Sequence, residues 1–444
     1  MWSRVCEPRT GVGHPRGWTG QEAAFLRLGW RTVTSPETAP PTATDDTRGG
    51  AATPISLRRS GIATAALFLV NGATFSNWLP RISEIRDELG LGNAGLGVTL
   101  LGGGLGGVIG ALLVGRVSER MGSSRLLSIA AITLSLGMPL IAFAPHAAVL
   151  LGLLTLLGTF DVFNDVAMNT QAVMVQERSG RQIMNRLHGM WSLGFTGGAL
   201  LGSLARAAEL SIRAHLVVVG LVLLATVLVC RRWFIPDDTA HDAHDAAASS
   251  SAGSRRRPTG PMIAMALAAV GAITLEVTPN DWAAVFFTDV FDAGRVAGFG
   301  TVACAGAMLV GRLAGDHVLE RLGEHRMTTL SFWFIGVGLA VTVVAPWPVL
   351  AVAGLVVWGL GLAPVFPLLY TTAARLPGTS AGAGLGWMLL GQRFGGMLTS
   401  VGVGSVSQWQ GMRTAFGAVA GAALALMLVS LREGNSAARR SSDA

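Results

Sequence analysis

The amino-acid sequence predicts an all-α polytopic membrane protein, with twelve transmembrane helices arranged as two pseudo-symmetric six-helix bundles. Three observations predict this fold class. The chain is 51% hydrophobic and only 13% charged, whereas a soluble chain carries about 25% charged residues. Apolar runs of about 20 residues, the length that crosses a bilayer as a helix, recur along the chain. Finally, one loop motif occurs twice at a fixed separation, which indicates two copies of one half with a site between them.

The repeated motif is a short arginine-rich stretch between two apolar runs. Residues 119–122 read Glu-Arg-Met-Gly, and 201 residues later positions 320–323 read Glu-Arg-Leu-Gly. Arg125 and Arg326 keep the same separation. We therefore expect the two motifs to be equivalent loops of the two halves.

Twelve apolar segments fit this duplication. They lie near residues 60–79, 94–115, 124–144, 147–171, 186–207 and 212–231 in the first half, and near 261–288, 296–315, 327–345, 348–371, 381–405 and 411–431 in the second. The predicted regions are a disordered N-terminal extension (1–57), an N-terminal bundle (58–231), a cytoplasmic linker (232–259), a C-terminal bundle (260–431) and a disordered cytoplasmic tail (432–444).

The distribution of positive charge predicts the orientation in the membrane. All 33 basic side chains are arginine, and most lie in the loops after even-numbered segments, in the linker and in the tail. Positively charged loops face the cytoplasm, so both termini and the linker are predicted to be cytoplasmic. Because these arginines cluster at the ends of apolar runs, the net charge of +7 indicates a lipid bilayer and not a nucleic acid as the partner.

The sequence predicts no cofactor, no metal site and no enzyme active site. Cys6, Cys230 and Cys304 lie far apart, without the spacing of a metal site. The histidines and aspartates of residues 241–245 lie in the polar linker. The glycine run at 102–110 lacks the Lys-Ser/Thr ending of a phosphate-binding loop, and we interpret it as a place of close helix packing.

The first repeated motif resembles the signature loop of the major facilitator superfamily, although Glu119 stands where that family usually has Asp. The resemblance implies a transporter of the bacterial cytoplasmic membrane, an alternating-access mechanism, and arginines that switch partners between conformational states. The residues that it assigns to these switch loops are Gly115, Glu119, Arg120, Gly122, Arg125, Asp316, Arg321, Gly323 and Arg326.

Within this superfamily, residues 60–431 are similar to the fucose-permease-like group and to its YbjJ-type inner-membrane branch. Four stretches carry the similarity: Asn77-Trp78-Leu79-Pro80-Arg81-Ile82, Asp165-Val166-Ala167-Met168-Asn169, His188-Gly189-x-Trp191-Ser192-x-Gly194 and Asp281-Trp282.

Polar residues inside apolar segments are the candidate functional residues, because an ionisable group in mid-membrane costs about 2.5–3.5 kcal/mol on insertion scales. The fourth segment holds the densest group, Asp161, Asn164, Asp165 and Asn169. Asp161, Asp165 and Asn169 share one helix face because they are spaced four residues apart. Two carboxylates one turn apart disfavour joint ionisation, so this face is a candidate proton site. A structural network with nearby arginines is the alternative.

Other segments supply candidate partners for this face. In the seventh segment, Glu276 is interpreted as a second cavity acid, and Pro279 is expected to break the helix beside Asn280. Arg393 lies well inside the eleventh segment and needs a carboxylate, for which the inward acids are the candidates. For Trp78, a membrane-interface anchor is the alternative to a place in the pathway. The predicted substrate and proton pathway contains Asn71, Trp78, Asp161, Asn164, Asp165, Trp191, Glu276, Asn280, Gln392 and Arg393.

Three functions remain open at this stage. The leading hypothesis is a monomeric secondary transporter that moves a small polar, sugar-like solute together with protons. The second is a proton-antiport exporter of drugs or metabolites, against which the missing Gly-Pro of the family's antiporter pattern counts. The third is a membrane sensor without transport, against which the buried charges count.

Overall fold

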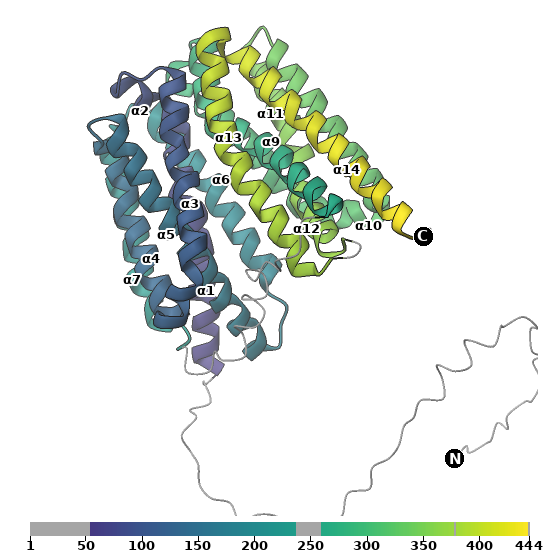
Figure 1. Ribbon diagram of the computed structural model, residues 1–444. Helices are drawn as coiled ribbons and strands as arrows, with labels where there is room; N and C mark the ends of the chain where they lie inside the picture. The colour runs from purple at the N-terminus through teal and green to yellow at the C-terminus, as the bar shows by residue number, and fades with distance from the viewer. Residues whose placement is uncertain (1–53, 237–258, 377–378, 443–444) are drawn as a thin grey trace, which may run out of the picture. The chain divides into compact units, whose positions relative to one another are not determined.

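The computed structural model describes residues 54–236, 259–376 and 379–442. These residues form helices joined by short connections, with no β-strand among them (Figure 1). Residues 1–53 of the predicted N-terminal extension and 237–258 of the predicted linker, with the metal-capable side chains of 241–245, lie outside the described part of the chain.

The first half of the chain forms six long helices. Short helical pieces follow the first, third and sixth of them. In order, the elements are α1 (Pro54–Ser76), η2 (Leu79–Arg81), α2 (Ile82–Glu88), α3 (Asn93–Met121), α4 (Ser123–Leu140), η3 (Ile141–Phe143), α5 (Ala147–Ser179), α6 (Met184–Ala207), α7 (Ile212–Cys230) and η4 (Arg231–Trp233).

The second half forms six corresponding spans, although some of its helices run together or are interrupted. Its elements are α9 (Gly260–Phe291), η6 (Gly294–Val296), α10 (Phe299–Val344), α11 (Pro348–Leu362), α12 (Val365–Ala374), α13 (Ala381–Ala415), the π-helical η7 (Phe416–Ala420) and α14 (Gly421–Ser442). Non-helical backbone at Gly323 divides α10 into two spans, and Gly411 separates the eleventh span from the twelfth. The predicted twelve helices in two bundles are confirmed.

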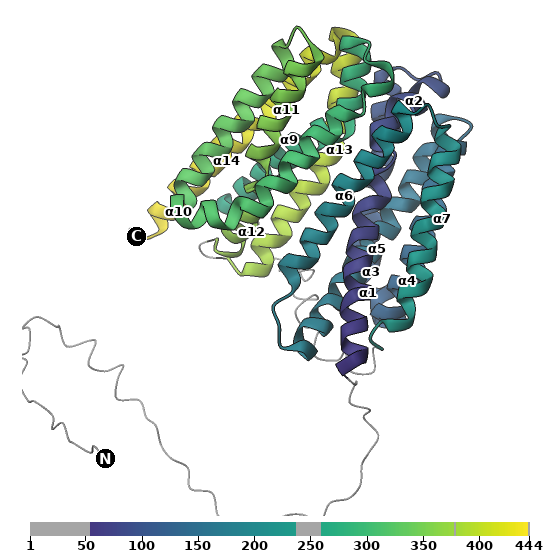
Figure 2. The ribbon, with the colours of Figure 1, turned by 180° about the vertical axis from the view of Figure 1, so that it is seen from behind.

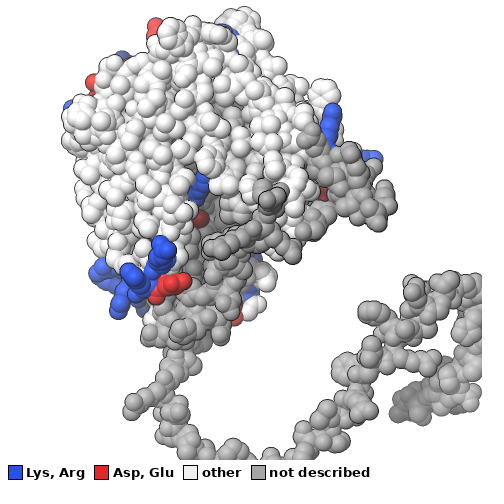
Figure 3. Space-filling model, viewed as in Figure 1, with Lys and Arg blue, Asp and Glu red and all other residues white. Residues whose placement is uncertain are grey.

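The helices have the length and composition of membrane spans. Ten described helical stretches are long and apolar enough to cross a bilayer, and the last of them, Gly382–Arg432, contains two spans. The polar α6 is not among the ten. Leu112 and Leu313, one from each half, are each 73% exposed. Much of the surface seen in Figure 3 is free of charge, as lipid-facing surface must be.

Three local expectations differ from the structure. The repeated motif is helical rather than a loop, because α3 continues to Met121 and Gly122 alone turns the chain, with φ 74°, a value that glycine adopts without strain. The helix α9 runs through Pro279 without ending, because neighbouring helices of a membrane bundle support a proline kink. The last helix continues to Ser442, into the stretch predicted as a tail, where Ala, Glu and Arg favour helix.

The internal repeat is visible as equivalent packing in the two halves. Gly122 and Gly323 have φ/ψ angles of 74°/160° and 74°/162°. A Cβ placed on Gly158 would lie 2.3 Å from the carbonyl oxygen of Gly103, and one placed on Gly359 would lie 2.5 Å from that of Cys304. Each of these pairs is related by the separation of 201 residues.

The two bundles meet at one end of the molecule, which we call the closed end (residues 77–95, 205–213, 288–298 and 404–413). There Nη1 of Arg86 donates to both oxygens of Asp289, each at 2.9 Å. Asn93 donates to the same carboxylate at 3.0 Å. Arg206 donates to Thr288 at 3.3 Å. Each of these contacts joins the first half to the second.

The opposite end, the arginine-rich end, contains residues 116–125, 178–186 and 321–326. The contacts described above that join the two bundles all lie at the closed end, and the ion pair next to the arginine-rich end, between Arg375 and Glu324, lies within the second bundle. In Figures 1 and 2 the bundles converge at the end that holds α2 and spread apart at the other. Arginines gather at the lower end of the first bundle in Figure 3. The two bundles are therefore joined at the closed end, and their helices diverge toward the arginine-rich end.

Candidate functional site

A hydrogen-bonded network in the first bundle includes one of the predicted acids. The indole nitrogen of Trp191 donates to Oδ1 of Asn71 at 2.8 Å. The amide nitrogen of Asn71 in turn donates to Oδ1 of Asp161 at 3.2 Å. Three helices, α6, α1 and α5, are thereby joined through residues that lie 90 and 120 positions apart in the chain.

Close packing of α1 and α6 makes this network possible. A Cβ placed on Gly72 would lie 2.1 Å from the carbonyl oxygen of Trp191, and one on Gly194 would lie 2.1 Å from that of Leu69. Glycine at these positions lets the two backbones touch. The side chains of Asn71 and Trp191, which neighbour these contacts, are then brought within hydrogen-bond distance.

Asp165 lies one turn along α5 and belongs to a second polar group. Its Oδ1 accepts from Asn169 at 3.0 Å. The charged groups that act on it are Arg393 of α13 and His188 of α6. Arg393 also acts on Asp161, so one arginine of the second bundle faces both acids of the first. Arg393 and Asp165 are solvent-exposed although both lie inside long helices, as residues that line the opening between the bundles would be.

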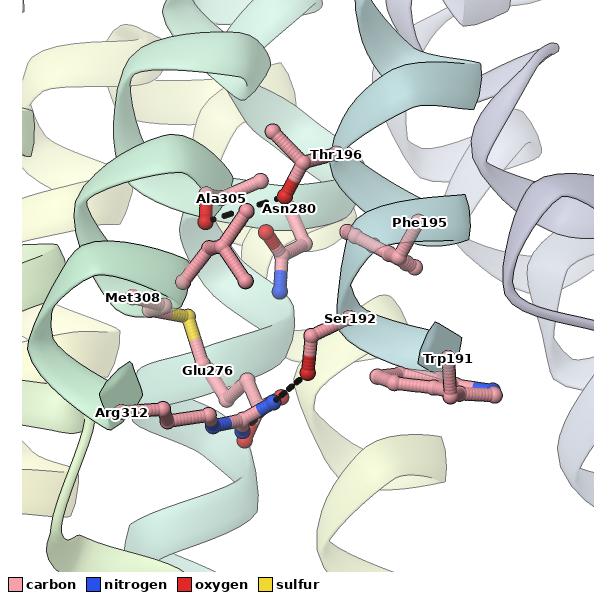
Figure 4. Close-up of a pocket in the computed structure, with 10 residues that line it drawn as sticks. Trp191, Ser192, Phe195, Thr196, Glu276, Asn280, Ala305, Met308 and Arg312 are labelled. Carbon is pink, nitrogen blue, oxygen red and sulfur yellow. Dashed lines mark hydrogen bonds and ion pairs between the residues drawn. The ribbon is translucent and has the colours of Figure 1, made fainter. Parts of the chain in front are cut away.

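A cavity lies next to these acids, between α6 of the first bundle and α9 and α10 of the second (Figure 4). It contains about 260 Å³ of empty space, part of it open to solvent. Trp191 and Phe195 stack with their ring centroids 5.4 Å apart and form an aromatic wall. The remaining lining residues are Ser192, Thr196, Glu276, Asn280, Ala305, Met308, Leu309 and Arg312.

The polar groups of this cavity connect the two bundles. Nη1 of Arg312 donates to the hydroxyl of Ser192 across the bundle interface at 3.3 Å, and Nη2 lies 3.8 Å from Oε1 of Glu276. Figure 4 shows these three side chains pointing toward one another. The Glu276 side chain is 17% exposed. Asn280 also lines the cavity, and among the described residues its Oδ1 is buried without a hydrogen-bond partner.

Sequence reasoning missed three residues of the site. Arg312 is not among the residues predicted from the sequence, and Ser192 enters only through the family resemblance. Tyr370 of α12 is the single tyrosine of the chain, and it interacts with Gln392, Asp165, Arg393 and Glu276. The only sequence signal for Tyr370 was a hydroxyl inside an apolar run.

The structure places the remaining predicted pathway residues in two ways. Gln392 forms a side-chain hydrogen bond with Tyr370, and neither is among the residues that line the cavity. Trp78 is 3% exposed and Asn164 is 2% exposed, so both are packed inside the first bundle. Among the described residues, the indole nitrogen of Trp78 and Oδ1 of Asn164 have no hydrogen-bond partner.

The predicted switch residues lie at the arginine-rich end, apart from the cavity. Glu119, Arg120, Arg125, Arg321 and Arg326 are exposed, and none of them forms an ion pair within the described part of the chain. Gly115 has open space around its Cα. The side chain of Asp316 lies outside what the structure describes. No group of three or more metal-ligating side chains occurs among the described residues.

Comparison with known proteins agrees with this architecture. The family model described as Major Facilitator Superfamily matches residues 62–400. An uncharacterised transporter of Sinorhizobium fredii is 29% identical over 313 residues, which are 70% of this chain and 81% of that protein. An uncharacterised MFS-type transporter of Yersinia pestis is 26% identical over 364 residues, 81% of this chain and 92% of that protein.

Solved structures show the same fold. The crystal structure of the nucleoside transporter NupG superposes with a TM-score of 0.67 at 15% sequence identity, covering 84% of this chain and 98% of that one.

Proposed function

The chain belongs to the major facilitator superfamily, and from this premise we propose that it is a proton-coupled symporter that moves a small polar, sugar-like solute by alternating access. A membrane transporter of this family implies a small-molecule substrate and a bilayer. Beyond family membership, we propose that protons are the coupling ion, that they move in the same direction as the solute, and that the solute is sugar-like. Similarity to the fucose-permease-like group and its YbjJ-type branch favours a sugar-like solute.

One observation carries the proposal. Asp161 and Asp165 of the first bundle lie close enough to Arg393 of the second for their charges to interact. Hydrogen bonds through Asn71 join Asp161 to Trp191 in the wall of the cavity. A carboxylate that exchanges a proton while its countercharge lies on the other bundle links protonation to the relative position of the bundles. Asp161 or Glu276 would carry the proton, and Asn71, Asn280 and Gln392 would hydrogen-bond the solute.

The aromatic wall of the cavity also favours a solute with a flat, weakly polar face. Trp191 presents its ring to the cavity, and its nitrogen is held by Asn71. Aromatic rings bind the C–H faces of sugars and the faces of bases, while hydrogen-bonding groups at the rim fix orientation.

The direction of proton movement tests the proposal. Purified protein in liposomes with a pH-sensitive dye outside is exposed to a panel of sugars, nucleosides and amphiphilic drugs. A symported solute makes the outside more alkaline, and the Asp161→Asn and Glu276→Gln variants are expected to reduce this change more than tenfold, about 1.4 kcal/mol or more in the transport barrier. If both variants keep full flux with an unchanged pH dependence, the assigned proton site is wrong.

The same assay separates the second candidate function. A proton-antiport exporter acidifies the outside in response to its drug or metabolite, and a sensor without transport gives no change for any compound. The acids inside membrane-spanning helices and the cavity between the bundles favour transport over sensing, because each uncompensated charge in a membrane protein is costly.

We further propose an arrangement for this transporter in the bacterial cytoplasmic membrane. The arginine-rich end faces the cytoplasm, so the described state is open to the inside, and one chain forms a complete transport unit. Protease accessibility of a tag at residue 444 in spheroplasts tests this orientation. Cleavage from the outside would contradict it.

A further inference from the structure

We propose that Gly107 is a positioning residue. Because it has no side chain, the guanidinium of Arg393 from the other bundle fits against α3 there and reaches the acids of α5. The inference deepens the proposed function, since it concerns the same acids. Gly107 belongs to the glycine run of α3, where the sequence indicated only close packing. In the structure, Gly107 of that run also leaves room for the Arg393 side chain.

The distance between α3 and α13 increases along their interface. At the closed end, a Cβ on Gly97 would lie 2.4 Å from the carbonyl oxygen of Ser400, so backbones touch there. Farther along, a Cβ on Gly104 would meet the Met397 side chain at 2.3 Å. At Gly107, the neighbour is the end of the Arg393 side chain. The helices therefore diverge until only this long side chain spans the gap between them.

The space at Gly107 is occupied by the guanidinium itself. A Cβ placed there would lie 2.9 Å from Nη1 of Arg393 and 3.6 Å from its Cζ. Such a separation is shorter than carbon and nitrogen atoms tolerate without a hydrogen bond, so any larger residue must displace the guanidinium. Because the guanidinium ends a flexible side chain, the displacement does not require the backbone to move.

The position of the Arg393 guanidinium determines which carboxylates it neutralises. The guanidinium lies against α3 at Gly107, one turn from where Gly158 of α5 packs on Gly103. It is there close enough to Asp161 and Asp165 of α5 for the charges to interact. Displacing it leaves two neighbouring carboxylates without the countercharge that the other bundle supplies, which favours their protonated forms. The other titratable or charged groups around this cluster are His188, Glu276, Arg312 and Tyr370.

The glycine run supplies its own matched control. Gly103 lies one turn earlier on α3, and a Cβ placed there meets nothing within 4 Å. Gly103→Ala and Gly107→Ala gain the same helix propensity, about 0.5–1 kcal/mol over glycine. They differ in whether the new methyl group meets Arg393.

Carbodiimide labelling tests the proposal without a solute. Dicyclohexylcarbodiimide reacts with protonated carboxyl groups and not with carboxylates, and mass spectrometry of fragments that contain Asp161 and Asp165 gives the labelling rate at neutral pH in the purified full-length protein. Gly107→Ala is expected to raise this rate about threefold and Arg393→Gln about tenfold, while Gly103→Ala leaves it unchanged.

The double variant distinguishes positioning from packing. If Gly107 acts through Arg393, adding Gly107→Ala to Arg393→Gln raises the rate no further. A multiplied effect in the double variant, an equal effect of Gly103→Ala, or no effect of Arg393→Gln would each overturn the proposal. Arg393→Gln keeps every glycine, so it gives an answer even if Gly107→Ala folds poorly. Labelling requires neither transport nor proton flux. If Arg393→Gln raises the rate and Gly107→Ala does not, only the part assigned to Gly107 fails, and the symport proposal is left to the proton-flux assay.

Discussion

The two halves of the molecule share their packing but not their chemistry. Gly158 and Gly359 occupy equivalent positions and each lets two helix backbones touch. Asp161 and Asp165, by contrast, have Leu362 and Phe366 as their equivalents 201 residues later. The halves therefore match where backbones meet and differ where side chains face the cavity.

In the second half, charged residues in turn stand where the first half has uncharged ones. Glu276 has Phe75 as its equivalent, and Arg393 has Ser192. The first bundle thus contributes Asp161 and Asp165 to the charged groups between the bundles, and the second contributes Glu276, Arg312 and Arg393. Duplication preserves helix packing because any larger residue at a contact glycine would clash, whereas a site between two halves works by opposing unlike charges across the gap.

The largest expected effect tests the shared packing. Gly158→Val and Gly359→Val should each destabilise the fold by about 3 kcal/mol or more, because the added Cβ meets a carbonyl oxygen of the neighbouring helix. Thermal unfolding followed by size-exclusion chromatography measures the loss. Gly152→Val, in open space on the same helix as Gly158, is the control. If Gly359→Val behaved like this control, the halves would not share their packing.

A smaller effect on stability is expected at the closed end, where an ion pair without a counterpart in the repeat joins the two halves. Arg86 pairs with Asp289 at the closed end, and its equivalent in the second half is Phe287. Arg86→Ala removes the ion pair of a partly buried carboxylate and leaves it the hydrogen bond from Asn93, a cost of about 1–3 kcal/mol that favours opening of this end. Labelling of Ser203→Cys by N-ethylmaleimide, with the native cysteines replaced, should become about tenfold faster, because Ser203 is fully buried at this seam.

Two further variants make the Arg86 experiment decisive. Arg295→Ala removes an ion pair with Glu209 whose side chains are 66% and 58% exposed, and such pairs contribute little. Its labelling rate should change by less than about twofold. Exchanging the charges through Arg86→Asp with Asp289→Arg should restore slow labelling. Equal rates for Arg86→Ala and Arg295→Ala would show that the Arg86 contact does not hold the end closed.

The cavity network gives a still smaller effect that concerns the first half alone. Trp191→Phe keeps the aromatic ring but loses the hydrogen bond to Asn71, a net contribution of about 1 kcal/mol. The solute concentration for half-maximal proton flux should rise about fivefold. Trp347→Phe, at a position 67% exposed and remote from the cavity, should change nothing. A similar rise in both variants would remove Trp191 from the solute site.

The smallest expected effect lies in the repeated motif itself. Arg120→Gln and Arg321→Gln change exposed side chains that form no ion pair within the described part of the chain. The melting temperature should stay within about 2 °C of the unchanged protein. The predicted partner switching concerns a different conformational state, so these variants should slow exchange between states. If the exchange rates in liposomes were unchanged, the only remaining role for these arginines would be to fix the orientation of the protein in the membrane.

Much of the fold was predictable from the sequence, and less of the site. The twelve spans follow from apolar length, and the duplication follows from one motif. Asp161, Glu276 and Trp191 were predicted as pathway residues because polar groups inside apolar segments are few. Arg312 and Tyr370 were missed, since nothing in a local pattern tells which side chains at the end of one helix reach into the space between two bundles.

By itself, the sequence determined the number of helices, their pairing into two halves and the end that collects arginine. These properties follow from chain composition, because a backbone in lipid must satisfy its hydrogen bonds within each helix. Tertiary structure alone decided which polar groups meet. Arg393 and Asp165 are 228 residues apart, and they come close because contact glycines such as Gly97 and Gly158 let α3 pack backbone to backbone against both α13 and α5.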